Sequence, residues 1–154
     1  MSSYAPDQRE LDGPAPELTA SLAYLLKHAQ QSLAELTSAA LEPHGISGRE
    51  LAVLMVLAGH EPASQQQAAQ RLGVDRTTMV ALLDGLEAKG LVGRRTHADD
   101  RRKNIVELTG AGRDTLRRAG QAAAGAERRF LTPLATPEAE RLKNALLALI
   151  RPAH

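Results

Sequence analysis

The chain has 154 residues, a length that favours one domain or one compact protomer. Apolar residues make up 43% and charged residues 24%, an ordinary globular composition that excludes wholesale disorder. The absence of cysteine excludes disulfides, thiolate zinc sites and cysteine redox sensing. The formal net charge is only +1, which by itself does not indicate a nucleic-acid partner.

Neither the N-terminal segment nor any apolar run indicates export or a membrane span. Residues 1–17 are polar and carry four acidic side chains, whereas a secretory signal needs a basic start and an apolar stretch. The densest apolar run, residues 51–58, is far shorter than the roughly 20 residues that cross a bilayer. We therefore expect a cytoplasmic protein without a membrane partner.

The N-terminal third predicts an arm and two helices. Residues 1–17 hold three of the eight prolines and few large apolar groups, as in a mobile arm. From Leu18 to Ala40 apolar residues recur every three or four positions, which predicts one long amphipathic helix that ends at Pro43 and Gly45. A second helix is expected after Ser47, which has a glutamate three residues on, the spacing of a capping box.

The middle of the chain predicts a helix-turn-helix. Ser64 is expected to cap a helix over QQQAAQRL that stops at Gly73. Asp75 is expected to cap a second helix, RTTMVALLDGLEAK, that stops at Gly90. Two helices joined by a short turn that contains glycine are typical of this motif.

The C-terminal half predicts a hairpin and two more helices. LVGRR (91–95) and NIVEL (104–108) have the short apolar period of strands, and the polar loop THADDRRK separates them. Thr109 is expected to cap a helix that runs to about Phe130, and Thr136 to cap a last helix with Pro137 in its first position. The fold class is therefore mainly α with a small β-hairpin, laid out as a winged helix.

The near-zero net charge conceals a gradient along the chain. Residues 1–63 carry three basic and eight acidic side chains, whereas residues 64–154 carry sixteen basic and ten acidic ones. Residues 94–103, at the predicted wing, hold five basic and two acidic side chains. A charge run is usually a solvated loop, but this one follows a helix-turn-helix, and the two together are the electrostatic pattern of a DNA-binding protein.

The helix after Asp75 has a core face and an opposite, small and polar face. Met79, Leu82, Leu83 and Leu86 form the apolar stripe. The other side and its flanks offer candidate DNA contacts at the end that a recognition helix directs into the major groove, namely Arg76, Thr77, Thr78, Val80 and Ala81. The alternative is that the two threonines only cap the helix. Ser64, Gln65 and Gln66 begin the preceding helix, where they could hold a phosphate or simply be solvated.

The segment LGVDRTTMVALLDGLEAKGLVGRR (72–95), followed by ADDRRKNIVELTGAG (98–112), closely resembles the MarR family of winged-helix transcriptional regulators. The strongest element is Asp100-x-Arg102, continued to Gly112, which has the spacing of the family's wing motif. The resemblance is specific over about residues 47–112, and outside them only the helix layout is similar.

The resemblance implies a homodimer on double-stranded DNA with an inverted-repeat operator. It divides the chain into an arm (1–17), a dimerisation helix (18–46), a winged helix-turn-helix (47–108) and C-terminal dimerisation helices (109–154). It further implies that Asp100 orients Arg102, which enters the minor groove beside Arg101, as expected for an arginine on a narrow loop. The alternative is that Asp100 and Arg102 only brace the hairpin. Phosphate contacts are expected of Arg94, Arg95 and Lys103.

Many family members release DNA when a small phenolic or other lipophilic effector binds, and the resemblance extends this expectation to the present chain. Tyr24, His28 and Met55 lie on the helices that would wall such a pocket, although a histidine or tyrosine there is more often a packing residue. The five histidines are scattered, which argues against a metal site, and no cofactor is expected.

Two other classes of function compete with a DNA-binding regulator. An enzyme is disfavoured because the chain has no glycine-rich phosphate loop, no nucleophile elbow and no paired metal-ligand motif. A winged helix used only for protein docking is the second alternative. A docking module has no need of Arg101 and Arg102 at a basic tip and would favour exposed apolar groups there.

Overall fold

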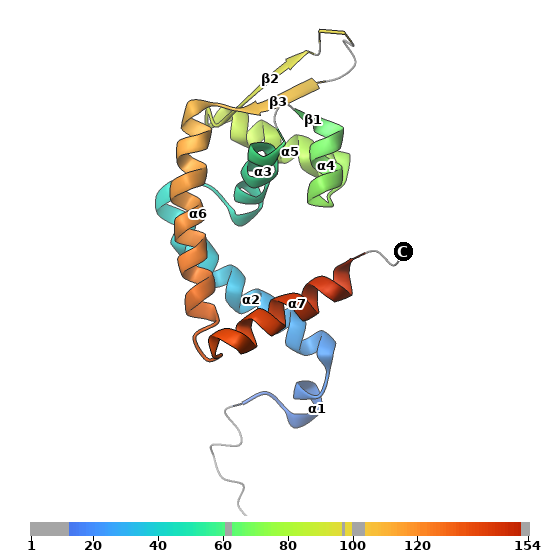
Figure 1. Ribbon diagram of the computed structural model, residues 1–154, viewed down its shortest axis with the longest axis vertical. Helices are drawn as coiled ribbons and strands as arrows, with labels where there is room; N and C mark the ends of the chain where they lie inside the picture. The colour runs from blue at the N-terminus through green and yellow to red at the C-terminus, as the bar shows by residue number, and fades with distance from the viewer. Residues whose placement is uncertain (1–12, 61–62, 97, 100–103, 152–154) are drawn as a thin grey trace, which may run out of the picture.

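The computed structural model describes residues 13–60, 63–96, 98–99 and 104–151, and these form a mainly helical chain with one small sheet (Figure 1). The sheet has three antiparallel strands in the order β1-β3-β2. The predicted fold class is confirmed. In chain order the elements are α1 (Pro16–Thr19), α2 (Leu22–Leu41), η2 (Glu42–His44), α3 (Gly48–Gly59), β1 (Ala63–Ser64), α4 (Gln65–Leu72), α5 (Arg76–Ala88), β2 (Val92–Thr96), β3 (Asn104–Leu108), α6 (Gly110–Phe130) and α7 (Thr136–Ile150).

The apolar spacing predicted one continuous N-terminal helix, but the structure has two separate helices there. Residues 16–19 form the single turn α1, and α2 starts only at Leu22. Between them Ser21 has an extended backbone, and its Oγ accepts a hydrogen bond from the Tyr24 backbone N–H at 3.4 Å. The predicted start at Leu18 is therefore wrong, because a serine cap interrupts a run whose apolar spacing continues across it.

The core lies where α3 packs between the helix-turn-helix and the sheet. The capping box predicted for Ser47 and Glu50 is present and fixes the start of α3. The sequence LAVLMVLA then places buried side chains on several faces of the helix, as expected for a central element. The largest fully buried side chains come from four elements, α2, α3, α5 and β3: Leu41, Val53, Leu54, Leu57, Met79, Leu83, Leu86 and Val106.

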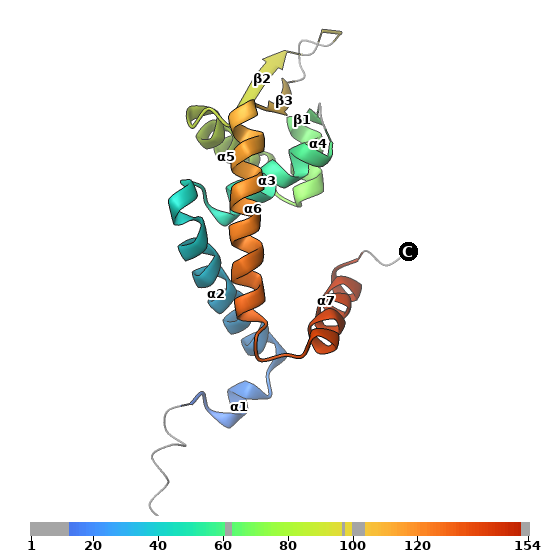
Figure 2. The ribbon, with the colours of Figure 1, turned by 60° about the vertical axis from the view of Figure 1, so that its left-hand side comes forward.

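The long helices α2 and α6 pack side by side below the winged helix, as both views in Figures 1 and 2 show. Thr109 caps α6, as predicted, and its Oγ1 accepts from the Gly112 backbone N–H at 3.0 Å. The same hydroxyl donates to the Gly90 carbonyl at 2.7 Å, which joins the start of α6 to the turn after α5. The winged helix is thereby fixed to the long helix pair.

The last helix, α7, leaves the far end of α6 and carries no buried residue (Figure 2). The cap predicted at Thr136 is wrong, because Thr136 is already the first helical residue and the N-cap is Ala135, without a side-chain hydrogen bond. Lys143 Nζ contacts Glu127 Oε2 of α6 at 2.9 Å. The exposed leucines of α7 are therefore left open to a partner.

The predicted hairpin is present, and a third strand joins it. β2 begins at Val92, one residue later than predicted, and β3 has the predicted bounds. The two-residue strand β1, which the sequence did not predict, pairs Ala63 with Val106 and ties the start of α4 to the wing. Within the described residues, no helix is long and apolar enough to cross a membrane.

Candidate nucleic-acid interface

The turn between α4 and α5 is built by local signals. Gly73 ends α4 with a left-handed backbone (φ 76°), a conformation that glycine adopts without a Cβ clash. Asp75 then caps α5, since its Oδ1 accepts from the Thr78 backbone N–H at 2.7 Å. This hydrogen bond is the main reason why the pKa of Asp75 lies below its ordinary value. The two helices are thus set at a fixed junction, as in a helix-turn-helix.

The recognition helix α5 presents the predicted faces. Met79, Leu83 and Leu86 are buried, and Leu82 is half-buried. On the opposite side and its flanks the candidate contacts are open: Arg76, Thr77 and Ala81 are exposed, and Thr78 and Val80 are half-buried. Because Asp75 supplies the cap, the side chains of the two threonines are not the capping groups of this helix.

A surface hollow of about 450 Å³ lies between the starts of α4 and α5 and the start of β3. Its lining brings together five of the predicted contacts, which are Ser64, Gln65, Gln66, Arg76 and Val80. Ser64 and Gln67 form a second capping box, with both hydrogen bonds at 3.1 Å, so the N-terminus of α4 is fixed there. Thr77, Thr78 and Ala81 do not line this hollow.

Sequence reasoning missed two polar residues of this hollow, Gln70 and Asn104. Gln70 lies one turn after Gln66 on α4, so the four-residue spacing could have identified it. Asn104 opens β3 at the end nearest the tip of the wing, and no spacing signal relates it to α4. Gln65 Oε1 is buried, and among the described residues it has no hydrogen-bond partner.

The wing carries two arginines on opposite faces of β2. Arg94 is directed at α5, where its guanidinium contacts the carboxylate of Asp84 and its Nε lies 3.6 Å from Glu87 Oε2. Only 19% of its side chain is exposed. Arg95 is 53% exposed and pairs with Glu107 of β3 at 3.4 Å. The wing strand is therefore linked to the recognition helix by charge.

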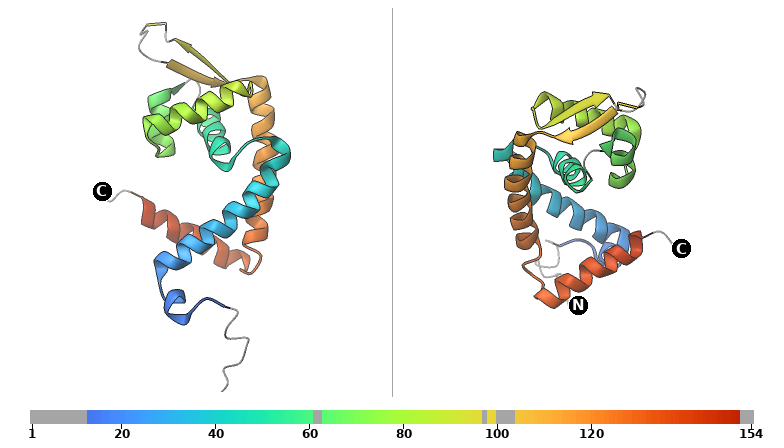
Figure 3. Two further views of the ribbon diagram at one scale, coloured as in Figure 1. Left: turned by 180° about the vertical axis from the view of Figure 1, so that it is seen from behind. Right: turned by 45° about the horizontal axis from the view of Figure 1, so that its top comes forward.

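Most of the wing tip, residues 97 and 100–103, falls outside the described residues. The predicted contacts Asp100, Arg101, Arg102 and Lys103 all belong to it, so their roles remain predictions. The strands that lead to the tip are described, and their register pairs Thr96 with Asn104. The hairpin rises past α4 and α5 at one end of the molecule, as Figure 3 shows from behind and from above.

Comparison with known proteins agrees with this geometry. Residues 44–103 match the profile of the MarR family. The repressor NicR of Pseudomonas putida is 32% identical over 108 residues, which are 70% of this chain and 68% of NicR. The repressor CouR, solved on a 23-mer DNA duplex, superposes with a TM-score of 0.86 at 33% identity, over 91% of this chain and 99% of that chain. The chain belongs to the MarR family.

A further solved relative carries a ligand. CouR from Rhodococcus jostii RHA1, bound to p-coumaroyl-CoA, is 25% identical with a TM-score of 0.79, over 91% of this chain and 99% of that chain. The share of each curated relative that this chain matches varies. It is 68% for NicR and only 44% for another curated repressor. Membership in the MarR family confirms the prediction of a DNA-binding transcriptional regulator, and the docking alternative finds no support.

The candidate effector residues of this MarR-family protein are only partly brought together. Tyr24 and His28 lie one turn apart on α2, with ring centroids 4.0 Å apart and planes tilted by 33°. Met55 lies on α3 and is 51% exposed. None of the three lines the hollow at the helix starts or a second hollow of about 380 Å³ beside Thr78.

Proposed function

We propose that this MarR-family regulator is a repressor that binds an inverted-repeat operator as a homodimer. The observation that carries the dimer is a set of leucines and one isoleucine left exposed on the terminal helices: Leu18, Leu22, Leu25, Leu26, Leu142, Leu146, Leu147, Leu149 and Ile150. Exposed apolar groups at helical spacing are typical of an interface. A two-fold dimer presents two recognition helices to two half-sites about 10 bp apart.

The polar hollow and the recognition helix supply the proposed DNA contacts. Ser64 and Gln66 lie at the N-terminus of α4, where backbone N–H groups and the helix dipole favour a phosphate. Gln65 lines the same hollow, and because its Oε1 is buried in the free protein, its amide can accept from the amino group of adenine or cytosine only after the side chain rotates. Thr77 and Ala81 occupy the open face of α5, where they can hydrogen-bond a base edge and contact a thymine methyl.

We assign Arg94 and Arg95 different roles, although phosphate contacts were expected of both. The guanidinium of Arg94 is already engaged by carboxylates of α5, so we assign it the task of holding the wing against the recognition helix. Arg95 is more exposed and its pair with Glu107 is an exposed one, which is a weak interaction. Arg95 is therefore the better phosphate ligand, together with Lys103.

We further propose that a small lipophilic or phenolic molecule releases the DNA. The ligand of the Rhodococcus jostii relative supports the phenolic class through its p-coumaroyl group, which is carried there on an anionic CoA, and the Tyr24–His28 pair offers a ring surface on α2. The curated relatives are bacterial regulators, so we place the protein in the cytoplasm, where bacterial DNA lies.

Footprinting on the DNA upstream of the protein's own gene tests the proposed function. We expect two protected half-sites related by a two-fold axis, with centres about 10 bp apart. Uniform, sequence-independent protection at low salt would contradict an operator-binding regulator. A single protected half-site would contradict the dimer.

Arg102→Ala is expected to weaken operator binding about tenfold and to lower the slope of log Kd against log salt by about 1 to 2 for the dimer. The reason is that one groove-inserted cation is lost from each wing. Fluorescence anisotropy at several salt concentrations measures both quantities. Arg128→Ala, which removes an exposed charge from α6, is the matched control. Unchanged affinity and slope would assign Arg102 a structural role only.

Thr77→Ala is expected to cost about tenfold in operator affinity and to leave binding to a scrambled duplex of the same length unchanged. The hydroxyl is exposed on α5 and is not the capping group of the helix, so its loss removes a base contact without disturbing the fold. Competition binding with the two duplexes measures the ratio. Equal losses on both duplexes would refute a base-reading role.

A further inference from the structure

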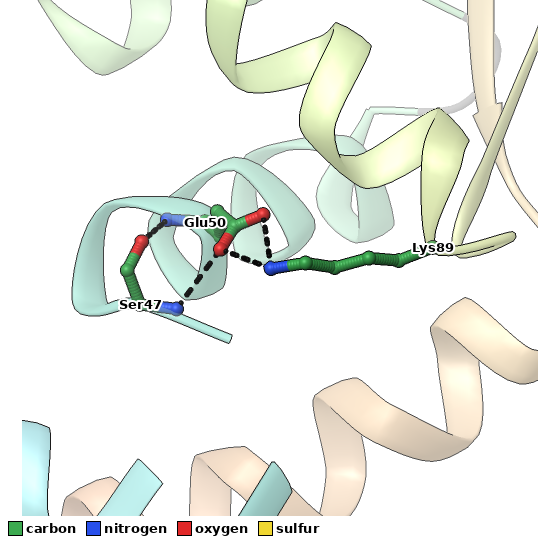
Figure 4. A network of polar contacts seen from close by, with 3 residues as sticks. All are labelled: Ser47, Glu50 and Lys89. Atoms are coloured by element: carbon green, nitrogen blue, oxygen red, sulfur yellow. Dashed lines mark hydrogen bonds and ion pairs between the residues drawn. The ribbon is translucent and has the colours of Figure 1, made fainter. Parts of the chain in front are cut away.

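One charged residue stands out from the apolar core. Glu50, in the first turn of α3, is the buried charged residue among those described, and only 11% of its side chain is exposed. Its carboxylate accepts hydrogen bonds from the Ser47 backbone N–H at 3.0 Å and from Lys89 Nζ at 2.8 and 3.0 Å (Figure 4). Both carboxylate oxygens therefore accept from a donor at the start of α3 or at the end of α5.

The charge of Glu50 is not needed for the helix cap. The second capping box of this chain has Gln67 at the equivalent position, and its neutral amide oxygen accepts from Ser64 N–H at 3.1 Å. Burial raises the pKa of Glu50, but the hydrogen bonds from Lys89 and Ser47 outweigh this effect and leave the pKa below its ordinary value. The carboxylate is thus ionised at neutral pH, and the group that uses its charge is Lys89.

Lys89 lies where the recognition helix ends and the chain continues into the wing. It is the C-cap of the recognition helix, and the chain turns at Gly90 (φ 73°) directly into the wing strand β2. One turn earlier, Gly85 also faces the pair, since a Cβ there would lie 3.5 Å from Glu50 Oε2. The end of α5 is therefore bonded to Glu50 through Lys89, and the space beside Gly85 is just wide enough for a Cβ next to the same carboxylate, while the DNA-facing residues lie at the other end of the helix.

From this geometry we propose that Glu50 and Lys89 are positioning residues, an ion-pair tether that sets the tilt of the recognition helix for base reading. α5 has 13 residues and is therefore about 20 Å long, so a tilt of about 5° at Lys89 moves its first turn by about 1.7 Å. Hydrogen bonds to base edges tolerate only about 0.5 Å. The hydrophobic effect around Met79 and Leu83 favours burial without selecting one contact point, whereas the ion pair holds Lys89 Nζ within 3.0 Å of both oxygens of Glu50.

The inference rests on the proposed operator reading, and two variants separate positioning from electrostatics. Glu50→Gln keeps an acceptor for Ser47 and makes the protein more positive, so electrostatics alone predicts tighter binding to any DNA. Lys89→Met keeps the aliphatic stem and makes the protein less positive, so electrostatics alone predicts weaker binding. Positioning instead predicts that both variants lose preference for the operator over a scrambled duplex.

The experiment measures Kd for the footprinted operator and for the scrambled duplex at one salt concentration. We expect the ratio of the two Kd values to fall about tenfold in both variants, and Lys89→Arg to restore it to within about twofold. Arg117→Met, which breaks an exposed Arg–Asp pair within α6, is the matched control and should leave the ratio unchanged. A lower thermal midpoint with an unchanged ratio would overturn the proposal in favour of a purely structural pair.

A second measurement is independent of operator reading. Residual dipolar couplings of the backbone amides in the DNA-free protein report the orientation of α5 relative to α3. We expect Glu50→Gln to change the couplings of α5 while those of α3 keep their pattern. Unchanged couplings throughout would contradict the tether even if the wild-type protein showed no operator preference, so the two proposals fail separately.

Discussion

Replacing Leu146 and Leu149 of α7 with glutamate is expected to give a folded monomer that binds the operator roughly a hundredfold more weakly. Both side chains are exposed in the single chain, and 71% of Leu149 is open, so their loss does not disturb the core. Between two protomers, however, four carboxylates would be brought together in an apolar contact, where desolvated like charges are strongly unfavourable. Without the dimer each half-site must be bound separately.

Sedimentation equilibrium and anisotropy with the operator duplex measure the two effects, and far-UV circular dichroism checks that the chain is folded. Asn144→Glu is the control, because it adds a glutamate on the polar side of the same helix, although one charge per chain instead of two. A dimer that persists in the double variant would show that α7 is not part of the interface. A monomer that binds the operator with the affinity of the wild-type protein would contradict the claim that operator binding requires the dimer.

Gly112→Ala is expected to destabilise the protein by about 3 kcal/mol, at the upper end of the range for overpacking. A Cβ at Gly112 would lie 2.0 Å from the Leu91 carbonyl oxygen, which is a backbone atom and cannot rotate away. The same carbonyl accepts from the Thr109 backbone N–H at 3.1 Å, so a shift that relieves the clash also breaks this contact. The start of α6 would separate from the strand that begins the wing.

Thermal unfolding at a fixed protein concentration measures this effect, and a decrease in Tm of about 6–12 °C is expected. Gly110→Ala, two residues earlier in the same helix, meets nothing within 4 Å and should be neutral or slightly stabilising. Equal effects of the two substitutions would mean that helix propensity, and not the contact with Leu91, decides the result. Operator binding should decrease in Gly112→Ala and not in Gly110→Ala, because the contact between the start of α6 and Leu91 holds the wing in place.

Local signals in the sequence predicted most of the elements. The Ser47–Glu50 spacing, the Asp75 cap and Gly73 act through hydrogen bonds within a few residues, so one stretch of chain contains all the information they need. The short strand β1 could not be predicted in this way, because Ala63 becomes a strand residue only by pairing with Val106. The break at Ser21 was missed because the apolar spacing continues through it.

The candidate site was predicted less completely than the fold. The exposed face of α5 follows from helical spacing, and the structure places those residues as expected. The partners of Arg94 do not follow from spacing, because Asp84 and Glu87 reach it only after the chain reverses at Gly90. The pairing of Glu50 with Lys89, 39 residues apart, likewise depends on how α3 and α5 pack.

Native mass spectrometry of the protein with the footprinted inverted-repeat duplex tests the central claim most directly. The account predicts one species with two chains per duplex, and its loss when either half-site is scrambled. A complex with one chain per duplex, or complexes of equal abundance on the intact and the scrambled DNA, would contradict a dimeric regulator that reads an inverted repeat.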